Sequence, residues 1–167
     1  GRYWQGGVWP GTNYMVITGL DKKGYTKQAK EIAKNHYSNV FEVYKNTGTF
    51  WEYYAPEAAE PGFMARKDFV GWTGLPPIAV FIEYILGIRS DYANHSVIWD
   101  ITQTEAHGIE RYPYGPDGLV SFKVNKRNSA DETPSVTIDS NVAFELTLLW
   151  GKDKGKKISI QIGKQTI

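Results

Sequence analysis

The sequence predicts an α+β protein, in which a helical part is followed by a strand-rich part and the change falls near residue 90. Before residue 90, apolar residues recur at the three- and four-residue spacing of helices. After it, apolar and polar residues alternate, and turn-forming residues separate the alternating segments. With 167 residues the chain is long enough for one ordinary domain or two small ones.

Residues 26–45 are the clearest predicted helix, with one apolar stripe and Thr26 suited to cap its start. A short helix is expected over residues 10–20, because Pro10 suits a first turn. A third helix is expected over 76–86, and it is apolar nearly all round, so we expect burial on most sides. Together these helices indicate a layered all-α body.

The second part predicts a small antiparallel β-sheet or sandwich. Alternating apolar residues, typical of half-buried strands, occur in several short segments. The expected strands are residues 97–101, 119–124, 135–139, 142–149 and 157–162.

Composition narrows the class of protein. Apolar residues make up 41% and charged residues 22%, no apolar run is long enough to span a membrane, and the net charge of +1 argues against nucleic-acid binding. The absence of Cys excludes disulfides, and the three His residues lack metal-ligand spacing, so neither a metal nor a cofactor is expected. Residues 1–20 lack a signal-peptide pattern, and their abrupt aromatic start predicts a fragment boundary.

Aromatic residues are the most informative feature of the composition. Six Trp and eleven Tyr occur, many of them near Gly and Pro. Aromatic side chains in loops present flat apolar faces with polar handles, which suit sugar rings. A large aromatic core is the alternative explanation. The irregular stretch 46–74 is rich in such residues, and a loop of that length is usually functional or disordered.

Glu52 lies within this stretch, between Phe50-Trp51 and Tyr53-Tyr54. Aromatic neighbours would desolvate a carboxylate, and tyrosine hydroxyls could donate hydrogen bonds to it. These are the means by which a carboxylate is adjusted for acid–base catalysis, and glycoside hydrolysis generally uses two carboxylates on opposite sides of the scissile bond. A lone Glu in an aromatic loop also commonly has a structural role.

Three motifs, taken in order, resemble the C-terminal portion of the trehalase- and glucosidase-like (α/α)6 toroid glycoside hydrolases. This group of six-hairpin glycosidases includes processing α-glucosidases and mannosylglycerate hydrolases. The motifs are Tyr3-Trp4-Gln5-Gly6-Gly7-Val8-Trp9-Pro10 with Asn13-Tyr14, Phe50-Trp51-Glu52-Tyr53-Tyr54, and Phe69-Val70-Gly71-Trp72-Thr73. Gln5 departs from the Arg that many relatives have, and Val70 interrupts the usual Phe-Gly-Trp spacing.

The resemblance implies that residues 1–90 are the C-terminal helices of a toroid and residues 91–167 an antiparallel β module. It implies an inverting enzyme that cleaves α-glycosidic bonds, with Glu52 as general base and the general acid upstream of this chain, so that the isolated fragment is inactive. The side chains expected to contact sugar are Trp4, Gln5, Trp9, Asn13, Trp51, Tyr53, Tyr54 and Trp72. The expected partners are an oligosaccharide or glycoside substrate, the missing N-terminal part, and a second copy through exposed helix faces. The sequence leaves the location undetermined, although a periplasmic or secreted bacterial protein is favoured.

Two alternatives make different structural predictions. If the strand-rich part is a non-catalytic carbohydrate-binding module, exposed aromatic residues should gather on its sheet. If the protein is a structural or regulatory relative without catalysis, Glu52 should be salt-bridged or packed away from any cavity.

Overall fold

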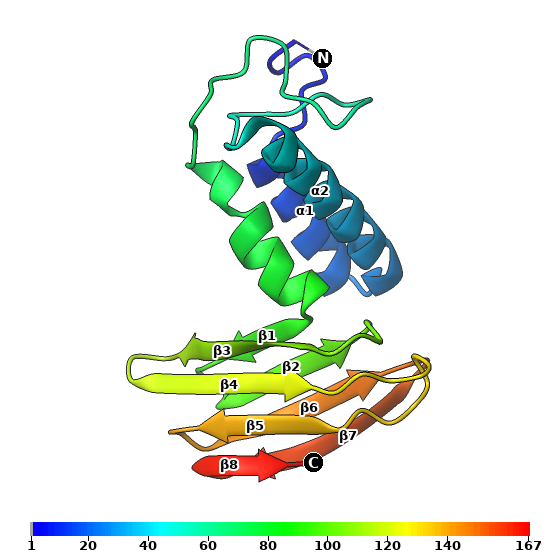
Figure 1. Cartoon of the computed structure of the whole chain (residues 1–167), viewed down its shortest axis with the longest axis vertical. Helices are drawn as coiled ribbons and strands as arrows, with labels where there is room; N and C mark the ends of the chain where they lie inside the picture. Colours follow the sequence, from blue (N-terminus) through cyan, green and yellow to red (C-terminus); the bar gives the residue numbers. More distant parts are fainter. Residues whose placement is uncertain (1) are drawn as a thin grey trace. The chain divides into compact units, whose positions relative to one another are not determined.

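The computed structural model describes residues 2–167. They form two compact units, which divide between Ile85 and Leu86. The helices belong to the first unit and the strands to the second (Figure 1). The sequence-based division at residue 90 lies within the first strand, β1 (Ile88–Asp91).

Unit 1 contains α1 (Pro10–Lys22), α2 (Thr26–Thr47), the short helix η1 (Trp72–Gly74) and η2 (Pro76–Ile85). The first two elements are the helices expected over residues 10–20 and 26–45. Thr26 is the first helical residue of α2 and makes no side-chain capping bond, so its expected capping role is wrong. The helix α2 ends at Gly48, whose left-handed backbone (φ 73°) lets its N–H donate to the Tyr44 carbonyl.

The core of unit 1 is small and lies where the three long helices meet. It consists of Ile17 from α1, Ala29 and Ala33 from α2, and Val80 and Tyr84 from η2. The two alanines carry little side-chain volume, which lets the helices approach closely.

The helix η2 is a π-helix, in which an N–H pairs with the carbonyl five residues earlier, as Val80 does with Leu75 at 2.9 Å. Pro76 and Pro77 have no N–H to donate at its start. This helix is partly buried: Pro76, Val80 and Tyr84 are buried, whereas Ile78 is 63% exposed.

The predicted fold class is also wrong, because residues 2–167 contain no (α/α)6 toroid. The three long helices pack around one shared core instead of forming the closed double ring that defines a toroid. Two four-stranded sheets make up the second unit, so most of the regular elements are strands. The toroid was inferred from the resemblance of the motifs and from the predicted helices around them, and neither signal specifies how many helices close into a ring.

The first sheet of unit 2 has the strand order β1-β2-β6-β7, with β2 at Ser96–Ile101, β6 at Phe144–Trp150 and β7 at Lys154–Ile160. The second has the order β3-β4-β5-β8, with β3 at His107–Tyr114, β4 at Gly118–Val124, β5 at Val136–Ser140 and β8 at Gly163–Thr166. Neighbouring strands are antiparallel except β2 and β6, which run parallel with Ser96 opposite Glu145. The prediction of a purely antiparallel β module is therefore wrong for one strand pair.

The two sheets share a core of aromatic rings, in which Trp99 of β2 contacts Phe122 of β4 at a centroid distance of 5.4 Å. Phe144 of β6 lies 6.2 Å from the same Phe122 ring. Beside this core Arg127 is buried, and its guanidinium donates to four backbone carbonyls at 2.8–3.0 Å. The arginine thereby ties the segment after β4 to the end of β2.

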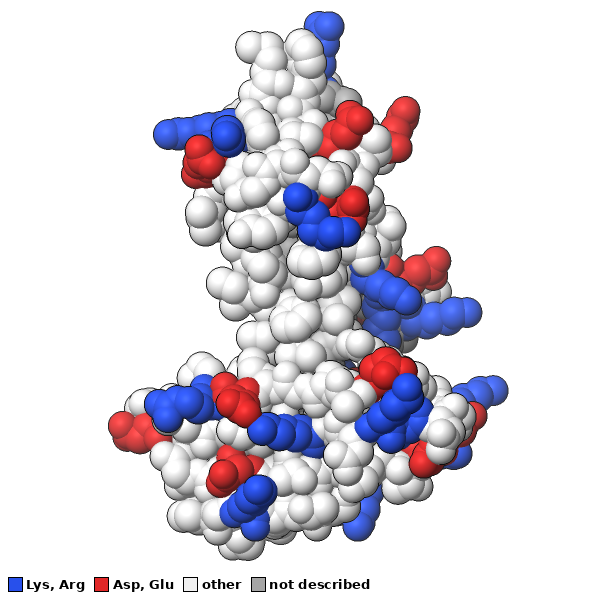
Figure 2. Space-filling model, viewed as in Figure 1, with Lys and Arg blue, Asp and Glu red and all other residues white. Residues whose placement is uncertain are grey.

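Charged side chains of both signs are interspersed on the face shown in Figure 2, and much of the visible surface is uncharged. No helix in the described part of the chain is long and apolar enough to cross a membrane.

Candidate functional site

The chain between α2 and η1 folds back on itself and forms one wall of the candidate site. Isolated antiparallel bridges pair Trp51 with Lys67 and Tyr54 with Pro61. Tyr54 also pairs with Val8 through two backbone hydrogen bonds of 2.9 and 3.0 Å. This long segment is therefore ordered by backbone hydrogen bonds, which also bring the first motif of the chain beside it.

Three aromatic side chains, one from each motif, meet around Trp9, which is 4% exposed. The Trp9 ring stacks on Trp4 at 3.9 Å and on Tyr53 at 4.7 Å, and it lies 5.7 Å from the tilted ring of Trp72. The cleft beside them has a volume of about 190 Å³, and we call it the aromatic cleft. Its lining is Trp4, Trp9, Gly11, Thr12, Met15 and Trp72. The motifs thus converge on one apolar surface.

Two exposed indoles present this surface to solvent. Trp4 is 63% exposed and Trp72 is 39% exposed. Flat apolar rings at an open cleft can stack against the C–H face of a sugar ring, because that face is also apolar.

Tyr53 supports the aromatic cleft, because its ring stacks on Trp9 and its hydroxyl bonds neighbouring backbone groups. Its hydroxyl donates to the Phe63 carbonyl and accepts from the Tyr3 N–H at 3.3 Å. Its ring lies against two glycines, because a Cβ at Gly62 would come within 2.2 Å of the ring and one at Gly7 within 2.8 Å. The close approach of the backbone to this ring therefore requires glycine at both positions.

Glu52 is connected to the cleft through its backbone. Its carbonyl accepts a 2.7 Å hydrogen bond from the Trp72 indole, and its N–H donates to the Arg66 carbonyl at 2.9 Å. The side chain is half-buried, and within residues 2–167 no hydrogen bond or ion pair holds its carboxylate.

The tyrosine hydroxyls beside Glu52 have other partners. The Tyr53 hydroxyl bonds Phe63 and Tyr3, as described above, and the Tyr54 hydroxyl accepts from the Trp51 N–H at 3.4 Å. The expectation that these tyrosines donate hydrogen bonds to the Glu52 carboxylate is therefore wrong. Burial raises the pKa of the Tyr54 hydroxyl to about 12.

Four of the predicted sugar-contacting residues lie away from the aromatic cleft. Trp51 and Tyr54 pack with Val40 and Val43 of α2, and the Trp51 indole donates to the Thr47 hydroxyl at 3.0 Å. The Asn13 amide pairs with His36 of α2 at 3.1 Å. The fourth, Gln5, is exposed, and its backbone pairs with that of Arg2.

Sequence reasoning missed three residues at the cleft. Tyr3 packs edge-on against Trp4 and Trp9, and Thr12 and Met15 line the cleft from α1. Tyr3 belongs to the first motif, so its position could have indicated a role. Met15 and Thr12 become neighbours of the indoles only because α1 begins at Pro10 and turns them toward Trp72. No group of three or more His, Asp or Glu side chains in the described residues is placed to bind a metal ion.

Comparisons of the sequence with known proteins found several relatives. A fission yeast protein named a probable mannosyl-oligosaccharide glucosidase (Schizosaccharomyces pombe) is 32% identical over 84 residues, which is 44% of this chain and 10% of that protein. A mannosylglycerate hydrolase of Selaginella moellendorffii is 44% identical over 72 residues, covering 43% of this chain and 13% of its own length. An uncharacterised protein of Borreliella burgdorferi is 27% identical over 121 residues, covering 66% of this chain and 26% of its own length. No solved structure matches significantly.

The segment that carries the aromatic cleft and Glu52 is thus related to the glycoside hydrolases. Residues 1–81 match the model of the glycosyl hydrolase family 63 C-terminal domain, which confirms the resemblance read from the three motifs. The chain spans only about a tenth to a quarter of the length of these curated relatives.

Proposed function

We propose that the protein, at its full natural length, is an inverting glycoside hydrolase that cleaves α-glycosidic bonds and that Glu52 is its general base. The observation that carries the proposal is the 2.7 Å bond from the Trp72 indole to the Glu52 carbonyl. This bond joins the Glu52 backbone to Trp72, one of the stacked aromatic residues that line the open cleft. The names of the fission yeast and Selaginella relatives support a glucose- or mannose-containing substrate.

In the proposed reaction, the Glu52 carboxylate removes a proton from a water molecule as that water attacks the anomeric carbon. The bond from this carbon to the leaving oxygen breaks, and a second carboxylic acid protonates that oxygen. We assign this acid to a part of the protein outside this chain. Inversion requires the two carboxyl groups to be about 6.5–9.5 Å apart, which leaves room for the water.

Trp4, Trp9 and Trp72 would stack against sugar rings, and Tyr53 would act by holding Trp9 in place. A carbohydrate-binding role for the second unit is less well supported. Tyr92 is the exposed large aromatic residue within residues 86–167. In unit 1, Trp4 and Trp72 are exposed at the aromatic cleft, and the Trp72 indole donates to the Glu52 carbonyl. The non-catalytic alternative expects Glu52 to be salt-bridged or packed away from any cavity. No ion pair of the described residues involves Glu52, whereas the residues that line the aromatic cleft do not include it.

The test compares the full-length wild type with Glu52→Gln and with Glu60→Gln, an exposed loop glutamate that serves as the matched control. Substrates would be α-linked glucosides, trehalose and mannosides, and NMR would identify the anomer of the product. Loss of general base catalysis should lower kcat about 10²–10⁴-fold in Glu52→Gln. The control should keep the wild-type rate, and thermal unfolding would confirm that both variants fold.

The possible outcomes separate the parts of the proposal. Wild-type activity in Glu52→Gln would remove Glu52 from the mechanism. A product of retained configuration would refute inversion but keep the hydrolase assignment. A protein inactive on every substrate would favour a binding or structural role.

A further inference from the structure

A second hollow in unit 1 lies behind the aromatic cleft, on the other side of the backbone pairing between Val8 and Tyr54. Val8 and Tyr54 line this hollow, whereas the residues next to them in sequence, Trp9 and Tyr53, stack in the aromatic cluster. Successive side chains of extended backbone point to opposite faces, which explains this division. The hollow has a volume of about 270 Å³, close to the lower end of the range for small-molecule sites. We call it the asparagine pocket.

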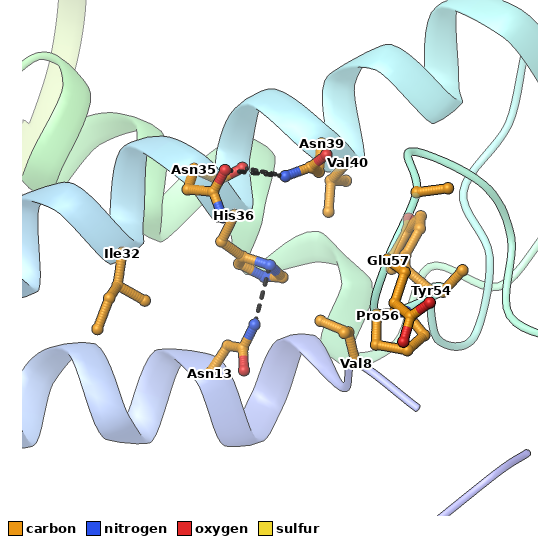
Figure 3. Close-up of a pocket in the computed structure, with 12 residues that line it drawn as sticks. Val8, Asn13, Ile32, Asn35, His36, Asn39, Val40, Tyr54, Pro56 and Glu57 are labelled. Atoms are coloured by element: carbon orange, nitrogen blue, oxygen red, sulfur yellow. Dashed lines mark hydrogen bonds between the residues drawn. The ribbon is translucent and has the colours of Figure 1, made fainter. Parts of the chain in front are cut away.

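Three carboxamides give this pocket its chemical character (Figure 3). Asn13 extends from α1 toward α2, and Asn35 and Asn39 lie one helical turn apart on α2. Asn39 Nδ2 donates to the Asn35 carbonyl at 2.9 Å and to Asn35 Oδ1 at 3.1 Å. The pair keeps an amide donor on Asn35 and an amide acceptor on Asn39 for another partner. Neighbouring donors and acceptors suit vicinal hydroxyl groups, because each hydroxyl can both donate and accept.

His36 adds a second polar group to the wall of the pocket. Its side chain is 5% exposed, and Nδ1 lies 3.1 Å from Asn13 Nδ2. An amide nitrogen only donates, so Nδ1 accepts and the proton of the neutral ring is assigned to Nε2. Within the described residues this buried Nε2 has no hydrogen-bond partner. A donor left unpaired in a buried position is unfavourable, and a bound acceptor can pair with it.

The charge of the lining excludes some classes of ligand. Neither lysine nor arginine lines the pocket, and Glu57 is its charged residue. Burial lowers the pKa of His36 to about 4, so the ring carries no positive charge near neutral pH. An anionic ligand would therefore meet the Glu57 carboxylate with no opposing cation. The lining instead favours an uncharged molecule with several hydroxyl groups.

We propose that the asparagine pocket is a second binding site for a neutral sugar or polyol, separate from the aromatic cleft. The ligand hydroxyls bond Asn35, Asn39 and Glu57, and Tyr54 with Val8 covers the apolar side of the ligand. This site does not depend on catalysis by Glu52, because Val8 and Tyr54 separate it from the Trp9 face.

The test measures binding of D-glucose and D-glucuronate to the full-length protein by saturation-transfer NMR. The two probes have the same ring and differ by one carboxylate. The double variant Asn35→Leu/Asn39→Leu removes the exposed amides, and Asn46→Leu is the matched control, because Asn46 is an exposed asparagine of α2 outside the pocket. We expect the double variant to bind glucose at least about tenfold more weakly, a loss of about 1.4 kcal/mol. We expect Asn46→Leu to bind like the wild type and glucuronate to bind at least about tenfold more weakly than glucose.

A Trp72→Ala variant separates this site from the aromatic cleft. Glucose binding that survives Trp72→Ala and disappears in the double variant supports the asparagine pocket. Binding that disappears in Trp72→Ala and is unchanged in the double variant belongs to the cleft and overturns the inference, as does equal binding of glucuronate or no binding of either probe. Hydrolysis by Glu52→Gln is a separate readout, so the two proposals can fail independently.

Discussion

Acid should destabilise unit 1 through His36, the buried histidine that joins α1 to α2. Its side chain is 5% exposed, and burial lowers the pKa from an ordinary 6.5 to about 4. Protonation would also place an N–H of the ring against the Asn13 amide, which donates to Nδ1 in the neutral state. The folded protein therefore resists protonation at this position.

The size and sign of the effect follow from the two pKa values. Above about pH 6.5 the ring is neutral in both states, and the pH has no effect through His36. As the pH falls from 6.5 toward 4, the unfolded chain binds the proton first, so the free energy of unfolding decreases. The difference between these pKa values corresponds to about 3 kcal/mol, at about 1.4 kcal/mol for each pH unit. Most of this free energy, about 2–3 kcal/mol, should be lost by about pH 4.5.

Urea unfolding of the wild type, His36→Asn and His95→Asn would test this reasoning. The helical circular dichroism signal reports on unit 1, because the helices of the described chain lie there. His95 belongs to unit 2, so His95→Asn should keep the wild-type response. Between about pH 7.5 and about pH 4.5, the free energy of unfolding of His36→Asn should fall by about 2–3 kcal/mol less than that of the other two proteins. Equal losses in all three would refute the assigned role of His36.

Three further substitutions test the packing of the two units. Gly62→Ala should destabilise unit 1 by about 1–3 kcal/mol, because the new Cβ would meet the Tyr53 ring, whereas Gly19→Ala on the open face of α1 should stabilise it by up to about 1 kcal/mol. Thermal unfolding followed by circular dichroism would compare the two, and an equal effect would contradict the close packing of Tyr53. Arg127→Met should destabilise unit 2 by about 2–4 kcal/mol, because the buried Ile101 carbonyl and three partly buried carbonyls lose their donor. Hydrogen exchange of the amides in β2 and β5 would measure this loss, and unchanged protection would show that Arg127 does not hold the segment.

Local patterns predicted the elements that depend on neighbouring residues in the chain. The three- and four-residue spacing over 26–45 corresponds to α2, and the alternation from Val136 to Leu148 corresponds to β5 and β6. The three aromatic motifs indicated the relationship that the comparison with family 63 confirms. Each of these signals is contained in a short stretch of sequence, where the side-chain period or the residue order is directly visible.

Local sequence patterns did not predict how the strands of unit 2 pair. The parallel pairing of β2 with β6 joins Ser96 to Glu145, and nothing in either stretch specifies a partner so distant along the chain. The short strand β8 has no buried residue to give it an apolar pattern. β3 contains a register shift between Ile109 and Tyr112, which interrupts the alternation used to recognise strands.

For the candidate site, too, the sequence determined some features and the tertiary structure determined others. The sequence by itself determined that Trp4, Trp9, Glu52 and Trp72 stand in motifs shared with glycoside hydrolases. Only the tertiary structure decided which aromatic rings form one cleft, because the pairing of Val8 with Tyr54 sends neighbouring side chains to opposite faces. For that reason Tyr53 supports the cleft while Tyr54, its immediate neighbour, packs toward α2. The direction of a side chain depends on how distant backbone segments pair, and residue order alone does not contain that information.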